Sequence, residues 1–297
     1  MHLGILGLGG IGGILSALFS MHNVSYECIR SKKNNNLFEK DYLELRSERY
    51  GDYKFIPVIL EDSIKNLDIL FISVKAQYLE ESLKSISKIN LNNTIIIPLL
   101  NGIGHIEMLK KKFGEELLLG TIGNIESQRS GNTILHKSNK LSPKIEFYKG
   151  KKSQENIVNK IIKILKDVGI DADVLDTEAA VVWKKLVRLD AISSFTTAYN
   201  MTVGELLDNN NIKNKMYEYL SETIMVAAKD GYISDAKTIM SQIEKLPYSL
   251  RTSMQKDVHS NKVSEVDFIT GGVLNLGTKF NIDMHEHNYI YKKIKNL

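Results

Sequence analysis

Short apolar runs alternate with amphipathic stretches through the N-terminal half of the chain. The run 67–74 is apolar almost throughout, which is typical of a parallel strand buried on both faces. The run 94–100 contains Pro98, which has no N–H for a ladder, so we expect an edge or irregular position there. Strands separated by helices predict a parallel, doubly wound sheet. The predicted strands are 3–6, 24–29, 67–74, 94–100 and 117–121, with weaker ones at 133–136 and 144–148.

The pattern changes near Asp176. Beyond this residue almost no strand pattern remains, and apolar positions recur at helical spacing. Asp176 precedes Thr177 and Glu178, a sequence typical of a helix N-cap with an acid in the first turn. We therefore expect an α/β domain over residues 1–175 and an all-helical C-terminal domain over residues 176–297. The helices predicted in the second domain are 177–197, 203–207, 212–229, 235–245 and 263–280.

A glycine-rich turn stands between the first predicted strand and the first predicted helix, and it fits the pattern G-x-G-x-x-G. In such a turn the first glycine permits a tight bend, the second lets the backbone approach a pyrophosphate, and the third lets the helix pack on the strand. A plain structural turn is the alternative, but the strand–turn–helix setting favours a Rossmann-type dinucleotide-binding domain. The cofactor-binding residues predicted here are Gly7, Leu8, Gly9, Gly10, Ile11 and Gly12.

The end of the second predicted strand distinguishes between the two nicotinamide cofactors. Enzymes that use NAD usually place an acidic residue there, which binds the ribose 2′-hydroxyl group. Here Arg30 begins a basic cluster with Ser31 and Lys32, and Glu27 lies inside the strand rather than at its tip. A guanidinium can bind a 2′-phosphate through two hydrogen bonds. The cluster therefore favours NADPH, and a solvated basic loop is the alternative.

Two further predicted strands end in polar residues. Lys75 directly follows the strand 67–74, and Asn101 directly follows the strand 94–100. Open α/β sheets bind ligands beyond the carboxyl ends of their strands. Both side chains are therefore candidates for a functional site, although a lone lysine at such a position is more often only solvated.

Composition and charge exclude several other classes of function. The 297 residues carry 39 basic and 35 acidic side chains, and the basic ones are scattered, so we expect no nucleic acid partner. Cys28 is the only cysteine, which excludes an internal disulfide, and its apolar surroundings predict a small core residue. We expect no metal site, and we interpret His285 and His287 as part of a polar turn or tail. Without a membrane-spanning run or a signal-peptide pattern, the chain is expected to be cytoplasmic.

A series of short motifs follows the glycine-rich turn along nearly the whole chain. The motifs comprise Gly7–Gly12, Arg30, Ser73–Ala76, Asn101–Gly104, Trp183–Leu186, Gly204–Leu206, Thr252–Met254 with Asp257, and Glu265–Ile269 with Gly271. Their order and spacing resemble those of the ketopantoate reductase family, whose members reduce 2-dehydropantoate to pantoate with NADPH.

The resemblance implies roles for five residues. Lys185 would donate a proton to the substrate carbonyl oxygen, and Glu265 would orient that lysine and contact the bound ligands. Ser253 would hydrogen-bond the substrate carboxylate. Asn101 would lie near the nicotinamide and the substrate, and Lys75 near the cofactor. The chemistry agrees, because a positioned ammonium stabilises the negative charge that develops on a ketone oxygen during reduction. Without the resemblance, Lys185 would be interpreted as a surface residue.

The chain departs from the family over the segment 122–127 and at three positions expected to contact the substrate. The family has asparagines four and eight residues after the catalytic lysine, and another just before the Gly-Glu-Leu match, where this chain has Leu189, Ser193 and Val203. The first two positions lie about 40° and 80° from the lysine around a helix, so they share its face. Each lost hydrogen bond removes roughly 1–3 kcal/mol of binding. Either polar neighbours compensate, or the substrate is a different and more apolar 2-oxo acid. The neighbours that could compensate are Asp190, Thr196 and Asn200.

The sequence thus predicts NADPH-dependent reduction of a small-molecule 2-oxo acid to a 2-hydroxy acid. Ketopantoate, in pantothenate biosynthesis, is the first substrate to test. One alternative keeps this chemistry on another 2-oxo or 3-oxo acid. A second alternative is a non-catalytic NADP-binding redox sensor, against which the presence of Lys185, Ser253 and Glu265 argues. The long C-terminal helices could pair between two chains, so a homodimer stays open beside a monomer.

Overall fold

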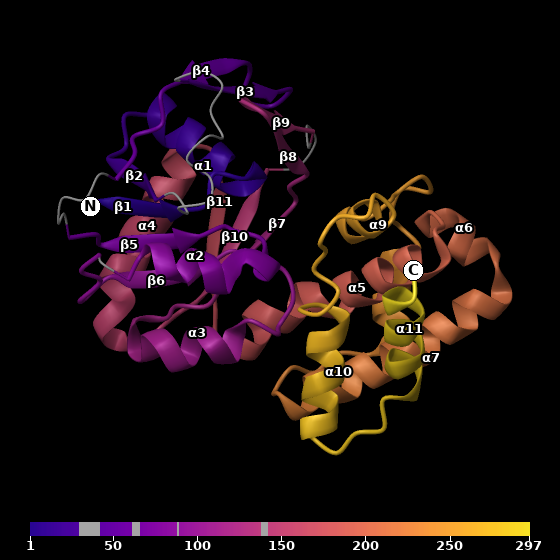
Figure 1. Cartoon of the computed structure of the whole chain (residues 1–297). Helices are drawn as coiled ribbons and strands as arrows, with labels where there is room; N and C mark the ends of the chain where they lie inside the picture. The colour runs from indigo at the N-terminus through magenta and orange to yellow at the C-terminus, as the bar shows by residue number, and fades with distance from the viewer. Residues whose placement is uncertain (30–41, 61–65, 88, 138–141) are drawn as a thin grey trace. The chain divides into compact units, whose positions relative to one another are not determined.

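The chain forms two compact units, drawn from indigo to magenta and from orange to yellow in Figure 1. The computed structural model describes residues 1–29, 42–60, 66–87, 89–137 and 142–297. The first unit consists of Met1–Leu100 and Met108–Thr177, and the second of Asn101–Glu107 and Glu178–Leu297. Within the described ranges, no helix combines the length and apolarity needed to cross a bilayer.

A parallel four-stranded sheet forms the centre of the first unit. Its strands are β1 (Leu3–Leu6), β2 (Tyr26–Ile29), β5 (Ile69–Ile72) and β6 (Ile95–Pro98), in the order β2-β1-β5-β6. Every residue of these strands is buried, as the almost continuous apolar run 67–74 predicted for β5. Pro98 ends β6, the last strand in this order, so its missing N–H is tolerated at the edge of the sheet as expected.

A second four-stranded sheet and a three-stranded sheet complete the first unit, and the sequence did not predict them fully. One has the order β4-β3-β9-β8 and the other the order β11-β10-β7, in which β7 and β10 are antiparallel. The strands that the pattern missed expose one face or contain few apolar residues, as in Ser-Gln-Arg-Ser of β8, so they carry no apolar run. The bounds are β3 (Leu43–Ser47), β4 (Tyr53–Phe55), β7 (Gly120–Gly123), β8 (Ser127–Ser130), β9 (Thr133–His136), β10 (Lys144–Tyr148) and β11 (Asp171–Leu175).

The helices of the first unit cover these sheets. The first of them, α1, packs against β1, β4, β8 and β9, and its apolar residues join the core between the sheets. Cys28 is completely buried in this core, 3.2 Å from the hydroxyl of Ser16, which confirms the prediction of a core cysteine. The bounds are α1 (Gly10–Met21), α2 (Leu79–Ser85), α3 (Ile106–Phe113), α4 (Glu155–Asp167), and the 3₁₀ helices η2 (Ala76–Tyr78), η3 (Gly114–Glu116) and η4 (Lys152–Gln154).

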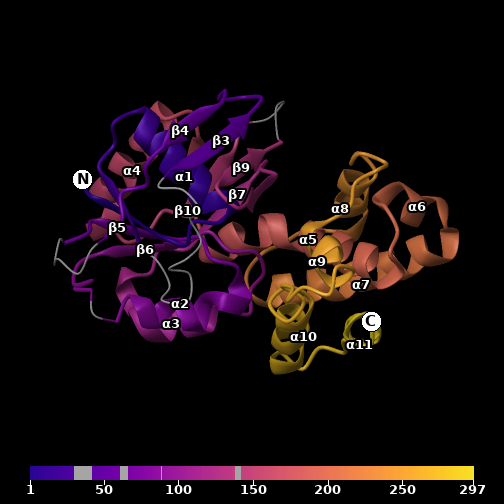
Figure 2. The same cartoon turned by 45° about the horizontal axis from the view of Figure 1, so that its top comes forward.

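The second unit is helical and is organised around its long helix α5. The bounds are α5 (Glu178–Tyr199), α6 (Val203–Asp208), α7 (Asn210–Lys229), α8 (Ala236–Ile243), α9 (Ser253–Val258), α10 (Thr270–Lys279) and α11 (His285–Lys295). Helices α6, α7, α8, α9 and α11 all contact α5, and Figure 2 shows α8 and α9 beside it. The helix predicted over 263–280 begins only at Thr270, because the carbonyl of Phe268 accepts hydrogen bonds from Ile103 and Gly104 instead of a helical N–H.

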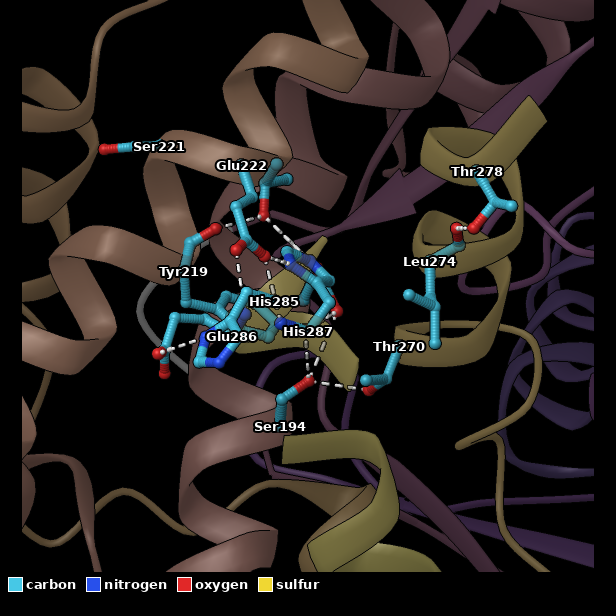
Figure 3. Close-up of polar contacts among 12 residues, drawn as sticks. Ser194, Tyr219, Ser221, Glu222, Thr270, Leu274, Thr278, His285, Glu286 and His287 are labelled. Carbon is cyan, nitrogen blue, oxygen red and sulfur yellow. Dashed lines mark hydrogen bonds and ion pairs between the residues drawn. The ribbon is translucent and has the colours of Figure 1, made fainter. Parts of the chain in front are cut away.

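A buried polar network joins α11 to α5 and α7, and Figure 3 shows its centre. His287 is fully buried; its Nε2 lies 3.0 Å from Asp190 Oδ2 and its Nδ1 lies 2.7 Å from Glu222 Oε2. The ring stacks on Tyr219, with 3.6 Å between ring centres. The interpretation of this histidine as part of a turn or tail was therefore wrong, because two buried carboxylates compensate its polar ring inside the core.

The carboxylates of Glu222 and Asp190 also accept hydrogen bonds from groups other than the imidazole of His287. Glu222 accepts hydrogen bonds from the backbone N–H groups of Glu286 and His287, at the start of α11. Asp190 Oδ1 accepts hydrogen bonds from Tyr219 and Ser194. The network therefore fixes the last helix of the chain against α5, the helix that carries Lys185.

Candidate active site

Helix α5 holds Lys185 at the surface of the second unit. Its neighbours Trp183, Leu186 and Val187 are buried in the helical core, whereas Lys185 is only partly buried. The indole of Trp183 donates a hydrogen bond to Asp230, at a distance of 2.7 Å. The apolar face of α5 thus fixes the helix, and the lysine lies on the opposite side with its ammonium accessible to neighbouring polar groups.

The segment after β6 brings Asn101 to this lysine. The N–H groups of Ile103 and Gly104 donate to the carbonyl of Phe268, at 2.9 and 3.1 Å. These bonds attach the segment to the turn that begins at Glu265. The predicted strand-end residue Asn101 consequently belongs to the second unit.

Asn101, Lys185 and Glu265 form one hydrogen-bonded cluster. The ammonium of Lys185 donates to Oδ1 of Asn101 over 2.7 Å, and the amide nitrogen of Asn101 donates to Oε2 of Glu265 over 3.3 Å. Glu265 is buried. The amide therefore links the cation to the carboxylate and orients both side chains.

The surroundings of Lys185 change its acidity. Removal from water lowers the pKa of Lys185 to about 8; the negative charge of Glu265 opposes this shift and the positive charge of Arg188 adds to it. An ammonium with this pKa is protonated at neutral pH and gives up its proton more readily than an exposed lysine. This is the property that a general acid needs near neutral pH.

Ser253 lies elsewhere on the second unit. It is exposed and is the first residue of α9, after the N-cap Thr252. The hydroxyl of Thr252 lies 2.9 Å from that of Thr196, which places this end of α9 beside the C-terminal half of α5. Within the described part of the chain, no hydrogen bond joins Ser253 to the lysine cluster. Its role with the substrate carboxylate stays a prediction.

The positions that depart from the family are closed to hydrogen bonding with a ligand. Val203 is fully buried and Ser193 is 1% exposed, while Leu189 is partly buried. The expected compensation does not come from Asp190, which is completely buried in the His287 network, nor from Thr196, whose hydroxyl donates to a backbone carbonyl of its own helix.

The third neighbour, Asn200, is also engaged. Its Oδ1 accepts hydrogen bonds from Arg251 and Gln255. Asp190 and Thr196 therefore do not compensate for the missing asparagines, because their polar atoms stabilise the helical unit itself. Asn200 is exposed and its amide nitrogen donates no hydrogen bond to the described residues, so compensation by this side chain stays a prediction.

The glycine-rich turn in the first unit has the geometry of a phosphate cradle. Gly7 has a φ of +100°, and a Cβ on Gly12 would lie 1.9 Å from the carbonyl oxygen of Gly7. The hydroxyl of Ser73 donates to that same oxygen over 2.8 Å. A Cβ on Gly9, by contrast, would meet no atom of the described residues within 4 Å, so among these residues the second glycine leaves open space at the start of α1. The turn therefore fits a dinucleotide pyrophosphate.

Arg129 supports this turn, although no pattern in the sequence indicated such a role. Its guanidinium donates to the carbonyl of Leu8 and to that of Gly131, each over 2.8 Å. Arg129 lies on β8, which has no apolar pattern, and 121 residues separate it from Leu8. Only the pairing of the second sheet brings them together.

Of the other predicted cofactor residues, Lys75 belongs to the first unit, whereas Asn101 and Glu265 belong to the second. Lys75 is exposed three residues after the end of β5, at the N-cap of η2. Arg30, Ser31 and Lys32 lie outside the described residues, so the 2′-phosphate assignment stays a prediction from the sequence.

Known protein families match both units. The family described as "Ketopantoate reductase PanE/ApbA" matches residues 3–149, and its C-terminal domain, "Ketopantoate reductase PanE/ApbA C terminal", matches residues 179–297. The chain belongs to the ketopantoate reductase family. As a member of this family it is an oxidoreductase that uses a nicotinamide cofactor, which confirms the enzyme class that the sequence predicted.

Individual relatives agree with this membership over nearly full length. The 2-dehydropantoate 2-reductase of Archaeoglobus fulgidus is 24% identical over 279 residues, which cover 94% of this chain and 92% of that enzyme. The solved 2-dehydropantoate 2-reductase of Geobacter metallireducens has a TM-score of 0.87 at 18% identity and covers all of this chain and 99% of its own. A D-mandelate dehydrogenase solved with NADH and anilino(oxo)acetate has a TM-score of 0.88 at 18% identity, covering 100% and 97%. These structures support the fold of a ketopantoate reductase family member.

Proposed function

We propose that this ketopantoate reductase family member reduces a 2-oxo acid to the 2-hydroxy acid with NADPH, and that 2-dehydropantoate is the first substrate to test. The observation that carries the proposal is the cluster of Lys185, Asn101 and Glu265. It combines a lysine of lowered pKa with a neutral amide and a buried carboxylate, which suits proton donation to a ketone oxygen.

The first unit supplies the groups for NADPH. The turn Gly7–Gly12 would hold the pyrophosphate, and Arg30 the 2′-phosphate. Ser73 and Arg129 fix the carbonyls of the turn, so that its N–H groups keep their direction. When bound, NADPH supplies the hydride. Lys75 is a further candidate for a contact with the cofactor.

The second unit supplies the groups for the substrate. Lys185 would hydrogen-bond the carbonyl oxygen, stabilise its developing negative charge and transfer a proton to it. Asn101 keeps the ammonium in place through its Oδ1, and Glu265 holds the amide in the required orientation. Glu265 also keeps the pKa of the lysine from falling further. Ser253 is proposed to contact the substrate carboxylate.

The identity of the oxo acid is open to two readings. Curated relatives are 2-dehydropantoate 2-reductases, which favours that substrate. The D-mandelate dehydrogenase carries an oxo acid with an aromatic substituent, and Leu189 and Val203 of this chain are apolar where the family has asparagines. The second reading keeps the chemistry and moves the substrate to a more apolar 2-oxo acid.

A substrate panel distinguishes these readings. NADPH oxidation is followed by absorbance with 2-dehydropantoate and with aliphatic and aromatic 2-oxo acids at equal concentrations. A kcat/KM that is highest for 2-dehydropantoate supports the first reading, and a higher value for an apolar acid supports the second. Tight NADPH binding without oxidation by any acid would contradict the proposal and favour a redox sensor.

Two further expectations concern the setting of the enzyme. We propose a homodimer in the cytoplasm, since a ketopantoate reductase of this fold from Staphylococcus aureus is dimeric. Light scattering after size-exclusion chromatography would give a mass near twice that of the 33.6 kDa chain. A mass equal to one chain would contradict the dimer.

A further inference from the structure

The helical turn after Lys185 presents two unlike side chains. Arg188 and Leu189 follow the lysine by three and four residues, which places them about 60° to one side and 40° to the other side of it around the helix. Both are partly buried. The surface beside the ammonium is therefore cationic on one side and apolar on the other.

Arg188 has no anionic partner among the residues that the structure describes. Across the described ranges, no hydrogen bond or ion pair joins its guanidinium to a carboxylate. Its positive charge lowers the pKa of Lys185, so the two cations repel each other, while the negative charge of Glu265 raises that pKa. A partly buried cation beside a second cation is unfavourable unless an anion lies between or beside them. The arrangement therefore suits an anionic ligand.

A 2-oxo acid has an anion at the required distance. Its carboxylate is bonded directly to the carbonyl carbon, so the group that binds the carboxylate must neighbour the group that binds the carbonyl oxygen. Side chains three residues apart on a helix have Cβ atoms about 5–6 Å apart and share a face. Arg188 meets this condition relative to Lys185. The positions where the family has asparagines do not offer a charge: Leu189 is apolar, and Ser193 and Val203 are buried.

We propose that Arg188 is a specificity-determining residue of this enzyme, which binds the carboxylate of the 2-oxo acid while Lys185 holds the carbonyl oxygen and Leu189 faces the carbon chain. This proposal rests on the proposed function and narrows it. The substrate class is a 2-oxo monocarboxylic acid whose remaining substituent is apolar next to the carbonyl. A guanidinium matches a carboxylate with two parallel hydrogen bonds, which fixes the orientation of the acid.

The charge of Arg188 also sets the pH range of the reaction. The groups that act on the ammonium of Lys185 include Asn101 and Glu265 from the segments packed beside it, and Arg188 from its own helix. Asn101 is neutral, and Glu265 raises the pKa of the lysine. Without the guanidinium, this pKa rises, and the fall of kcat/KM at alkaline pH moves to a higher pH.

The test compares Arg188→Gln, Arg188→Lys and a control, Lys184→Gln, which removes an exposed cation from the same helical turn. The best 2-oxo acid of the wild-type panel and its methyl ester are the two probes. We expect Arg188→Gln to raise KM for the acid about 10- to 100-fold, the range for losing a charge-assisted pair, with a much smaller change for the ester. Arg188→Lys keeps the charge, so it should keep the wild-type alkaline limit and recover only part of the KM.

The outcomes separate this proposal from the proposed function. Wild-type turnover with an unchanged KM and an unchanged alkaline limit in Arg188→Gln would overturn the role of Arg188 and leave the reductase intact. An equal loss for the acid and the ester would also overturn it, because a general structural effect does not distinguish the carboxylate. Absence of turnover in the wild type with every 2-oxo acid would overturn both. Fluorescence of the buried Trp183 reports whether each variant keeps the native helical unit.

Discussion

Replacement of His287 by phenylalanine tests the buried network that holds the last helix. The substitution keeps an aromatic ring that can stack on Tyr219, and it removes both hydrogen bonds from the imidazole. Asp190 and Glu222 then lose the group that neutralises them. The change therefore removes the charge pairing with little change in packing volume.

The expected loss follows from those two contacts. Each nitrogen of His287 bonds a buried carboxylate, at 3.0 and 2.7 Å. Removing one partner of a buried ion pair costs about 3–5 kcal/mol, because the remaining carboxylates keep neutral hydrogen-bond donors but lose their counter-charge away from water. With a urea m-value of about 2 kcal/mol/M, the midpoint of unfolding should fall by roughly 2 M.

Fluorescence of Trp183 provides the assay. It is the only tryptophan of the chain, and it is fully buried in the same unit, so its emission follows unfolding of that unit. His285→Gln is the matched control, because His285 lies on the same helix with a side chain that is 79% exposed. This control should cost less than about 1 kcal/mol, as exposed ion pairs do. A midpoint for His287→Phe that equals the control would refute the reasoning.

Three other results are expected. Burial alone would lower the pKa of His287, but its bonds to two carboxylates raise it, so its stabilising contribution is complete below its ordinary value of 6.5 and declines as the pH rises through the raised pKa. Burial would raise the pKa of Glu222, but its hydrogen bonds lower it, so the stabilising contribution of this carboxylate is lost as the pH falls from 4.5. The urea midpoint plotted against pH should therefore fall at both acidic and alkaline pH, and His287→Phe should lack the alkaline fall. Gly12→Ala should lose about 1–3 kcal/mol of stability, because its Cβ would collide with the turn, whereas Gly9→Ala should keep stability and weaken NADPH binding; equal thermal midpoints for the two variants would contradict the cradle. Arg30→Ala should raise the apparent Kd for NADPH at least roughly 10-fold while that for NADH changes little, and equal effects on both would exclude the 2′-phosphate assignment.

Local patterns predicted the parts of the fold that depend on nearest neighbours. Apolar runs such as 69–72 mark buried parallel strands because both faces of the sheet are covered. Strand β8 was not predicted, because the edge strand Ser-Gln-Arg-Ser contains no apolar residue. Helix α11 was not predicted either. Its His287 is a polar residue, and its burial is favourable only because Asp190 and Glu222, far away in the chain, bind its ring.

The residues of the candidate site were likewise predicted only in part. Motif matches pointed to Asn101, Lys185 and Glu265, and the structure brings these three side chains into one cluster. Arg129 was missed because its contact with the glycine-rich turn depends on sheet pairing. The sequence suggested that neighbours such as Asp190 replace the missing asparagines. Asp190 is instead buried in the His287 network, and this burial depends on the packing of the helices, which the sequence pattern does not show.

The most direct test of the central claim is kcat/KM against pH for 2-oxo acid reduction by the wild type and by Lys185→Met. The lysine must be protonated to donate, so the wild-type rate should be constant at neutral pH and fall as the pH rises through about 8. Lys185→Met should bind NADPH like the wild type and lose roughly 100- to 10,000-fold in rate, the range for a general acid. Wild-type turnover that Lys185→Met retains, with the same pH profile, would contradict the account.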